Sequence, residues 1–275
     1  MSIDSREANC EQLAFRYSLL VIDKLYHPYI WKVTQMSTPI TDSKTWDSLW
    51  SANFAKYIEG APRTGVFVHR ITPKAKTYLE LGAGSARDSF YLNIIGKHAV
   101  ASDFSEIAID AWRKSFGPVL PAKLVDAFHI DATDGAFDVT FHNGLYVLFD
   151  DDKIKALVAE QRRVTRSTMI IIVHNKRNSR LVSSFAQLGD DNPIFRIRLF
   201  DPLEMVSLVQ NSGIPYRKIT VHKFGGPADR FYHWFGARVH DTKRSSIAGA
   251  LANILYPLQP WARVERAAIV VHCAG

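Results

Sequence analysis

Short apolar runs rich in β-branched residues alternate with helical stretches from about Tyr78 to the end of the chain. This order is typical of a parallel sheet covered by helices, because each crossover between parallel strands needs a long connection. The pattern therefore predicts an α/β domain. Its expected strands are Lys76–Leu81, His98–Ser102, Ala122–Val125, Phe137–His142, Met169–His174, Tyr216–Lys223 and Ala267–His272.

Helices are expected between these strands from the residues that begin and end them. One helix, Arg87–Ile95, follows a glycine-rich turn, and a second, Ser105–Ser115, begins at a serine cap. A third, Asp151–Arg166, begins with acids and ends with arginines, which complements the helix dipole. A fourth begins at Asp201-Pro202 and ends near the terminator Asn211-Ser212-Gly213.

Residues 1–70 differ from the rest, because aromatic side chains stand among polar, helix-compatible residues with prolines at positions 28, 39 and 62. They are predicted to form an N-terminal helical cap or lid, and residues 71–275 the main domain. A chain of 275 residues can bury one large core with such an addition. Ligands of an α/β sheet bind at the carboxyl ends of the strands. The cap and an excursion over residues 175–200 are therefore candidate walls of a substrate pocket.

Composition argues against several classes of protein. No apolar run reaches the roughly 18 residues that cross a bilayer, and the first residues lack the plan of a secretory signal. A cytoplasmic protein without a membrane segment is expected. Cys10 and Cys273 lie at opposite ends, which supports neither a zinc site nor a disulfide framework. His222, His233 and His240 lack the i, i+4 spacing of a helical metal site, so no metal is predicted.

The chain is basic, with 34 Lys and Arg against 27 Asp and Glu and a net charge of +7. Such a balance mildly favours anionic partners. The surplus is scattered in short pairs such as Arg162-Arg163, and no nucleic-acid-binding module is recognisable. A solvated surface is therefore favoured over a nucleic-acid footprint.

One stretch carries a recognisable binding pattern: the expected first strand ends in Glu80-Leu81-Gly82-Ala83-Gly84 and leads into a helix. The glycines allow a tight turn and close approach of a ligand, and Asp103 follows about 20 positions later, where a carboxylate can accept hydrogen bonds from ribose hydroxyls. Nicotinamide dehydrogenases share this spacing. Here, however, Arg87 replaces their third glycine, and Glu80 would repel a pyrophosphate.

Four pieces follow in order: Glu80 to Gly84, Ala101 to Ser105, Val125 to Phe128 and Phe137 to Gly144. Together they resemble the successive motifs of the class I S-adenosylmethionine-dependent methyltransferases, in register from about Trp46 to the C-terminus. The resemblance implies a Rossmann-like, seven-stranded, mostly parallel sheet in the order 3-2-1-4-5-7-6. The last strand would be antiparallel, with helices on both faces, and the cofactor would be S-adenosyl-L-methionine.

The same resemblance implies the cofactor-binding residues. The loop Gly82-Ala83-Gly84 would lie against the methionine part, with Glu80 orienting its amino group directly or through water. Asp103, followed by Phe104, would hold the ribose hydroxyls.

Asp126 would meet the adenine amino group, with Ala127 and Phe128 beside the ring. Asn143 would lie near the methionine end. Two alternatives stay open: Asp126 can cap a loop, and Asn143-Gly144 can be a turn signal.

Methyl transfer needs positioning, exclusion of water and, for a protonated nucleophile, a base. His142 and His174 end two strands at the expected active rim, and imidazole titrates near neutrality, so both are candidate bases. Tyr146 is a third. Strand alternation could equally point either histidine into the core. The sequence His142-Asn143-Gly144-Leu145-Tyr146 also departs from the Asn/Asp-Pro-Pro-aromatic tetrad of methyltransferases that act on nucleobase amino groups, which argues against a DNA base as acceptor.

The resulting prediction is methyl transfer to an O, N or C atom of a small or medium-sized metabolite, with specialised metabolism as one setting. Alternatives are an RNA or protein methyltransferase, a noncatalytic partner subunit that keeps the cofactor pocket, and a nicotinamide oxidoreductase. The oligomeric state stays open, a homodimer included.

Overall fold

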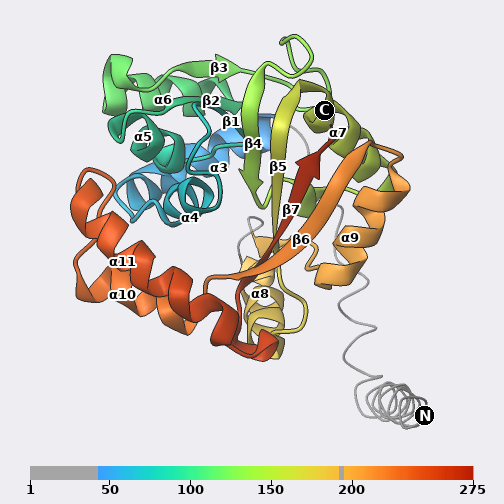
Figure 1. The fold of residues 1–275 in the computed structure, drawn as a ribbon. Coiled ribbons are helices and arrows are strands. Elements are labelled where there is room, and N and C mark those ends of the chain that lie inside the picture. The colour runs from blue at the N-terminus through green and yellow to red at the C-terminus, as the bar shows by residue number, and fades with distance from the viewer. Residues whose placement is uncertain (1–42, 192–194, 275) are drawn as a thin grey trace, which may run out of the picture. The chain divides into compact units, whose positions relative to one another are not determined.

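The computed structural model describes residues 43–191 and 195–274. Within them a single seven-stranded sheet has the order β3-β2-β1-β4-β5-β7-β6, as predicted (Figure 1). The strands are β1 (Thr77–Leu81), β2 (His98–Asp103), β3 (Ala122–Leu124), β4 (Phe137–Asn143), β5 (Thr165–His174), β6 (Tyr216–Phe224) and β7 (Arg266–Cys273).

Strand directions place the carboxyl ends of β1, β2, β4 and β5 at one edge of the sheet. These strands pair in parallel, and β7 runs antiparallel to both of its neighbours. Consequently the first residue of β7, Arg266, lies opposite both His174 at the end of β5 and Phe224 at the end of β6. This edge, called the carboxyl edge below, gathers the chain segments on which a ligand of such a sheet is expected.

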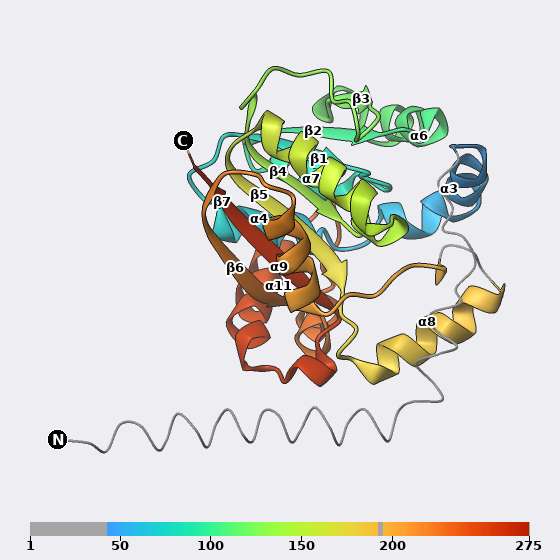
Figure 2. The ribbon, with the colours of Figure 1, turned by 90° about the vertical axis from the view of Figure 1, so that its right-hand side faces the viewer.

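Helices cover both faces of the sheet (Figure 2). One face carries α4 (Arg63–Ile71), α5 (Arg87–Ile94), α6 (Glu106–Phe116) and α11 (Thr242–Leu255), and the other carries α7 (Asp151–Val164) and α9 (Pro202–Asn211). Three further α-helices in the described ranges are α3 (Ser43–Ile58), α8 (Ser179–Asp191) and α10 (Arg230–Trp234). α3 contacts α6, and α10 packs on α11. The prediction of helices on both faces is confirmed.

Two hydrophobic clusters follow the two faces because side chains alternate along each strand. The cluster under α4 and α11 contains Val139 and Phe141 of β4 and Ile170 and Ile172 of β5. The cluster under α7 and α9 contains their neighbours on β5, such as Ile171. We call these the α4 face and the α7 face. The alternation assigns each strand-end residue to one of them.

The element boundaries differ from the predictions in instructive ways. The helix expected over Asp151–Arg166 ends at Val164, because Thr165 is extended and pairs with Phe137 at the start of β4. A β-branched residue favours this change to strand. β5 therefore begins four residues before the expected Met169. The expected excursion over residues 175–200 contains α8. The stretch before β7 contains α10 and α11, which were not predicted because the sequence there has no clear helical periodicity.

The predicted N-terminal cap is helical where the structure describes it, in α3 and α4. Its earlier aromatic residues, Tyr17 to Trp31, lie outside the described residues. The boundary at residue 70 between cap and main domain stays a prediction. In the described ranges no helix is both long and apolar enough to cross a membrane.

Candidate functional site

The glycine loop after β1 has the backbone conformation that its sequence predicts. Gly82 and Gly84 have φ values of +56° and +57°, in the left-handed region where a side chain is unfavourable. Ala86, which precedes α5, also has a positive φ of +52°. The buried indole of Trp112, on α6, fixes the loop, because its Nε1 donates to the carbonyl of Gly84 at 2.8 Å. The indole of Trp50 lies against Gly84, so a β-carbon at this position would collide with it.

Glu80 lies just before this loop and is 2 % exposed. Its Oε2 accepts hydrogen bonds from the amide and the hydroxyl of Ser89, at 3.0 and 2.6 Å. Burial, followed by the charge of Asp88, raises the pKa of Glu80 well above its usual range. Glu80 therefore fixes the first turn of α5 with one oxygen, while its Oε1 has no hydrogen-bond partner among the described residues.

Asp103 ends β2 and reaches the glycine loop directly. Its two oxygens accept hydrogen bonds from the amides of Gly84 and Ser105, at 3.1 and 3.2 Å. Burial raises the pKa of this carboxyl, although both amides oppose the shift. Phe104, the next residue, is 36 % exposed. Asp103 thus contacts the glycine loop, and its predicted role at the ribose hydroxyls stays a prediction.

Asp126 lies in the segment after β3 and is exposed. Its Oδ1 accepts a hydrogen bond from the amide of Phe128 at 2.9 Å, which is the loop cap weighed as an alternative. Ala127 and Phe128 are partly buried against the cluster of the α7 face, where the ring of Phe128 meets Phe149 edge to face. The outer carboxylate oxygen of Asp126 lies 3.4 Å from the ring of His129.

Asn143 ends β4 on the α4 face. Its amide nitrogen donates to the hydroxyl of Thr64 on α4 at 3.1 Å, whereas its Oδ1 is buried and has no hydrogen-bond partner in the described part of the chain. The following Gly144 has a φ of +89°, so the turn reading of Asn143-Gly144 also holds. An unpartnered buried acceptor is costly, which makes Asn143 Oδ1 a ready contact for a ligand donor.

His174 ends β5 on the same face, beside Asn143. The Cε1 atom of its ring lies 3.4 Å from where a β-carbon on Gly144 would be, and its Nδ1 is buried without a partner. Phe185 of α8 packs edge to face on the imidazole, with 5.1 Å between ring centroids. Burial, aided by the charge of Arg266, lowers the pKa of His174 to about 3. The imidazole is therefore neutral near pH 7.

His142 and Tyr146 lie on the opposite, α7 face. His142 is fully buried and accepts a hydrogen bond from the amide of Leu145 at 3.2 Å. Its ring packs at a tilt of 40° against Tyr146, with 4.1 Å between ring centroids. The hydroxyl of Tyr146 donates to Gln161 of α7 at 2.5 Å. Burial lowers the pKa of His142 to about 3. The structure thus brings Asn143 and His174 together and separates His142 and Tyr146 from them.

A group of charged residues at the carboxyl edge was not anticipated. Arg63, at the start of α4, forms an ion pair with Asp229, whose other oxygen accepts a hydrogen bond from the hydroxyl of Tyr256 at 2.5 Å. Asp88 of α5 accepts the amide of Gly65 at 2.7 Å. These partners lie up to 166 residues apart in the sequence, and none belongs to a local motif. Only the fold brings them together.

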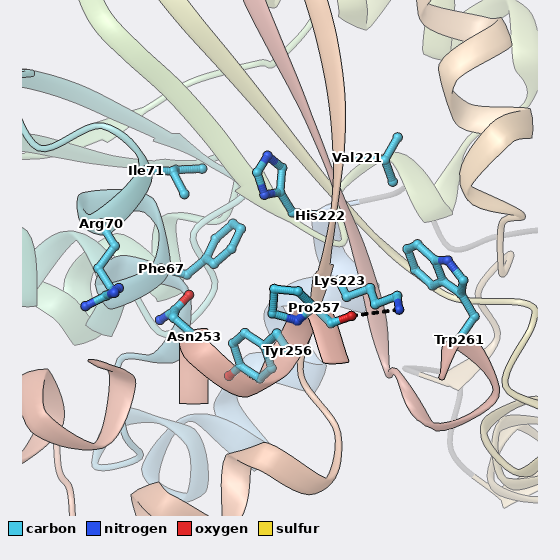
Figure 3. Close-up of a pocket in the computed structure, with 10 residues that line it drawn as sticks. All are labelled: Phe67, Arg70, Ile71, Val221, His222, Lys223, Asn253, Tyr256, Pro257 and Trp261. Atoms are coloured by element: carbon cyan, nitrogen blue, oxygen red, sulfur yellow. Dashed lines mark hydrogen bonds between the residues drawn. The ribbon is translucent and has the colours of Figure 1, made fainter. Parts of the chain in front are cut away.

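A hollow of about 450 Å³ lies on the α4 face between α4, the end of α11 and β6 (Figure 3). Phe67, Trp261 and Tyr256 line it together with the polar side chains of Arg70 and Lys223. None of the site residues predicted from the sequence lines this hollow. It is therefore separate from the glycine loop and from the ends of β4 and β5.

Comparison with known proteins supports the resemblance. Residues 79–168, which hold the glycine loop, Asp103, Asp126 and the end of β4, match the sequence model of a family described as "Methyltransferase domain". Over these residues the chain carries a methyltransferase domain, as the resemblance to S-adenosylmethionine-dependent methyltransferases predicts. Its cofactor is accordingly S-adenosylmethionine. No curated protein matches the sequence of this methyltransferase.

Solved structures share the fold of the methyltransferase. A SAM-dependent methyltransferase of Thermotoga maritima is 15% identical, with 78% of this chain and 88% of that one covered and a TM-score of 0.53. The 1,6-didemethyltoxoflavin-N1-methyltransferase of Burkholderia thailandensis is 13% identical, with 87% and 93% covered and a TM-score of 0.52. The [4+2]-cyclase SpnF is 12% identical, with 84% and 94% covered and a TM-score of 0.53. At these identities the likeness establishes the architecture alone.

Proposed function

We propose that this methyltransferase methylates an O, N or C atom of a small or medium-sized metabolite. The observation that supports this most is the pair of unpartnered atoms Asn143 Oδ1 and His174 Nδ1, which lie buried at neighbouring strand ends. α4 covers Asn143, and Phe185 of α8 covers His174. An acceptor that reaches them must fit beneath these helices, which favours a compact molecule over a folded polymer.

The described residues fit the cofactor. The positive φ values at Gly82 and Gly84 leave the backbone of the loop open to a ligand, and the unpartnered Asn143 Oδ1 can accept a hydrogen bond from the amino group. In this proposal Gly82, Ala83 and Gly84 contact the methionine part.

The remaining cofactor contacts follow the resemblance. Glu80 would orient the amino group through Oε1, Asp103 with Phe104 would hold the ribose, and Asp126 with Ala127 would meet the adenine. When bound, S-adenosylmethionine supplies an electrophilic methyl group on a sulfonium sulfur that leaves as a neutral thioether.

Of the three candidate bases, the geometry favours His174. Its neutral Nδ1 is free to accept a hydrogen bond from an acceptor O–H or N–H, which would hold the nucleophile in line with the methyl group. Tyr146 is engaged by Gln161, and its ring packs on His142. We therefore assign His142 and Tyr146 to supporting the turn after β4 and His174 to the acceptor.

The comparisons add limited support. The Burkholderia structure is described with 1,6-didemethyltoxoflavin and S-adenosylhomocysteine bound, which shows that this architecture can hold a small acceptor beside the spent cofactor. The cyclase SpnF shows that the same architecture also serves a reaction other than methyl transfer. An RNA or protein methyltransferase and a noncatalytic partner subunit stay the alternatives to be tested.

A labelling experiment separates these functions. The protein is incubated with S-adenosylmethionine carrying a radiolabelled methyl group and a cell extract separated into small molecules, RNA and protein. We expect label in the small-molecule fraction, and less of it with the Asp103→Ala variant when the cofactor is below saturation. Label in RNA or protein alone would establish the polymer methyltransferase instead. Binding of the cofactor without transfer to any fraction would favour the noncatalytic subunit.

A further inference from the structure

Arg266 is a largely buried cation that makes no hydrogen bond to the described residues. Its side chain is 17% exposed, and its Nε is fully buried without a partner. Among the described residues its one ion-pair contact joins Nη1 to Glu265 Oε2 at 3.8 Å, which is beyond hydrogen-bond distance. Burial, followed by the charge of Arg63, lowers the pKa of Arg266. Such a guanidinium destabilises the fold unless something else pairs with it.

The nearby acids do not form a close pair with Arg266. Asp88 is near enough for the charge of Arg266 to lower its pKa, but it makes no ion-pair contact with Arg266 among the described residues. Both oxygens of Asp229 are engaged, one by Arg63 and one by Tyr256. Glu265 is 38% exposed and lies 4.0 Å from Arg63 as well, so water screens its attraction to Arg266.

Other unpartnered atoms gather around the same edge. Five of the eight buried side-chain atoms without a partner, counted over the described ranges, lie on the α4 side of the carboxyl edge: Arg266 Nε, Arg87 Nε, Tyr232 OH, His174 Nδ1 and Asn143 Oδ1. In the proposed function Asn143 Oδ1 serves the amino group of the cofactor, and His174 Nδ1 accepts from the nucleophile. The other three atoms, Arg266 Nε, Arg87 Nε and Tyr232 OH, can each donate a hydrogen bond, so a group that satisfies them is rich in acceptor atoms. A carboxylate, with two oxygens that match the guanidinium fork, fits this requirement best.

The position of Arg266 places its proposed carboxylate ligand away from the cofactor. Arg266 faces the α4 side, because Ala268 and Val270 of the same strand belong to that hydrophobic cluster. It lies opposite His174, one strand beyond β5, whereas the glycine loop follows β1 and Asn143 ends β4. Two strand spacings, about 10 Å, separate the backbones of β4 and β7. Arg266 lies two residues along β7 from Ala268, which is level with Asn143. His174 stands between them.

We propose that Arg266 binds a carboxylate of the methyl acceptor, so that the substrate is an acid whose reacting atom lies beside His174 and Asn143. This inference rests on the proposed function, since it names the class of acceptor for the same site. The carboxylate neutralises the charge that depresses the basicity of His174. Binding of the acid therefore also makes His174 a better hydrogen-bond acceptor for the nucleophile.

The test titrates acetate, benzoate and naphthalene-2-carboxylate, each with its amide as a neutral match, into the protein saturated with S-adenosylhomocysteine. Ligand-observed NMR follows wild type, Arg266→Gln, Arg266→Lys and a control, Arg113→Gln, which removes an exposed guanidinium on α6. At least one acid should bind wild type and the control, with affinity about tenfold lower in Arg266→Gln and partly retained in Arg266→Lys. The amides should bind no better to wild type than to Arg266→Gln.

Separate titrations of S-adenosylhomocysteine keep the two proposals apart. Its affinity should be the same in wild type and Arg266→Gln. If it were lost in the variant while the acids were unaffected, Arg266 would serve the cofactor's own carboxylate, and the inference would be wrong. Equal binding of every acid to wild type and Arg266→Gln would also overturn it. Failure of the wild type to bind S-adenosylhomocysteine would sink the proposed function instead, and the acids would then be titrated into the protein alone.

Discussion

Asp103 is the residue that joins the second strand to the glycine loop. Because its carboxylate lies at the proposed ribose position, Asp103→Ala should weaken binding of S-adenosylhomocysteine by about tenfold to a hundredfold, the usual range for a hydrogen bond to a charged group. Calorimetric titration measures this. Asp110→Ala, which removes an exposed acid of α6, should leave the affinity unchanged. Equal affinities of wild type and Asp103→Ala would show that the ribose lies elsewhere.

His142 makes stability depend on pH. Its pKa is lowered from 6.5 to about 3 in the folded state, so between these values the unfolded chain binds a proton that the folded chain does not. Its stabilisation is therefore complete above the unfolded pKa and is lost as pH falls. Between about pH 7 and about pH 5 this costs about 2 kcal/mol of the free energy of unfolding.

His142→Asn tests this, because an asparagine can still accept from the Leu145 amide but does not titrate. Urea unfolding at the two pH values should show the loss of stability reduced by about 2 kcal/mol in this variant. His98→Asn, which changes an exposed histidine, should behave as wild type. An unchanged pH dependence in His142→Asn would contradict the assignment.

For single residues, the sequence predicted which positions belong to the site better than it predicted which residues they contact. Glu80, Asp103 and Asn143 were identified because the family resemblance implies them, and each lies at or next to the end of an apolar strand. Their contacts with Ser89, Gly84 and Thr64 were not, since strand alternation and helix packing decide them. Arg266 carried no signal, because an arginine before a strand is ordinary until the fold buries it.

Among the elements, the strands were predictable because β-branched runs bounded by turn residues carry their own signal. The helix α9 was equally clear, and its capping box at Asp201 and Glu204 is present. α10 and α11 were missed: α11 has small residues where it is buried, Ser245, Ala248, Gly249 and Ala252, and so lacks a strong apolar stripe.

The same small residues give a test of how α11 packs. A β-carbon at Gly249 would collide with Val66 of α4, so Gly249→Ala should lower the free energy of unfolding by about 1–3 kcal/mol through overpacking. At Gly189 of α8 the nearest atoms would be 3.5 Å from such a carbon, so Gly189→Ala should be neutral or stabilise by up to about 1 kcal/mol. Urea unfolding compares the two. A loss at Gly189 with none at Gly249 would mean that α11 packs differently.

For the whole molecule, the sheet order and the direction of its last strand were implied by the family resemblance and are confirmed. The acceptor could not be read from the sequence, because the atoms that would contact it come from the ends of β4, β5 and β7 and from helices distant in the chain. The balance of charge illustrates the same limit. A net charge of +7 says little about a site where arginines and carboxylates are interleaved.

The central claim is that the glycine loop holds S-adenosylmethionine rather than a nicotinamide dinucleotide. The most direct measurement is calorimetric titration of the folded protein with S-adenosylmethionine, S-adenosylhomocysteine and NADH. We predict that the first two bind with dissociation constants below about 1 mM and that NADH gives no binding heat. Binding of NADH without either sulfur compound, or no binding of any of the three, would contradict this account.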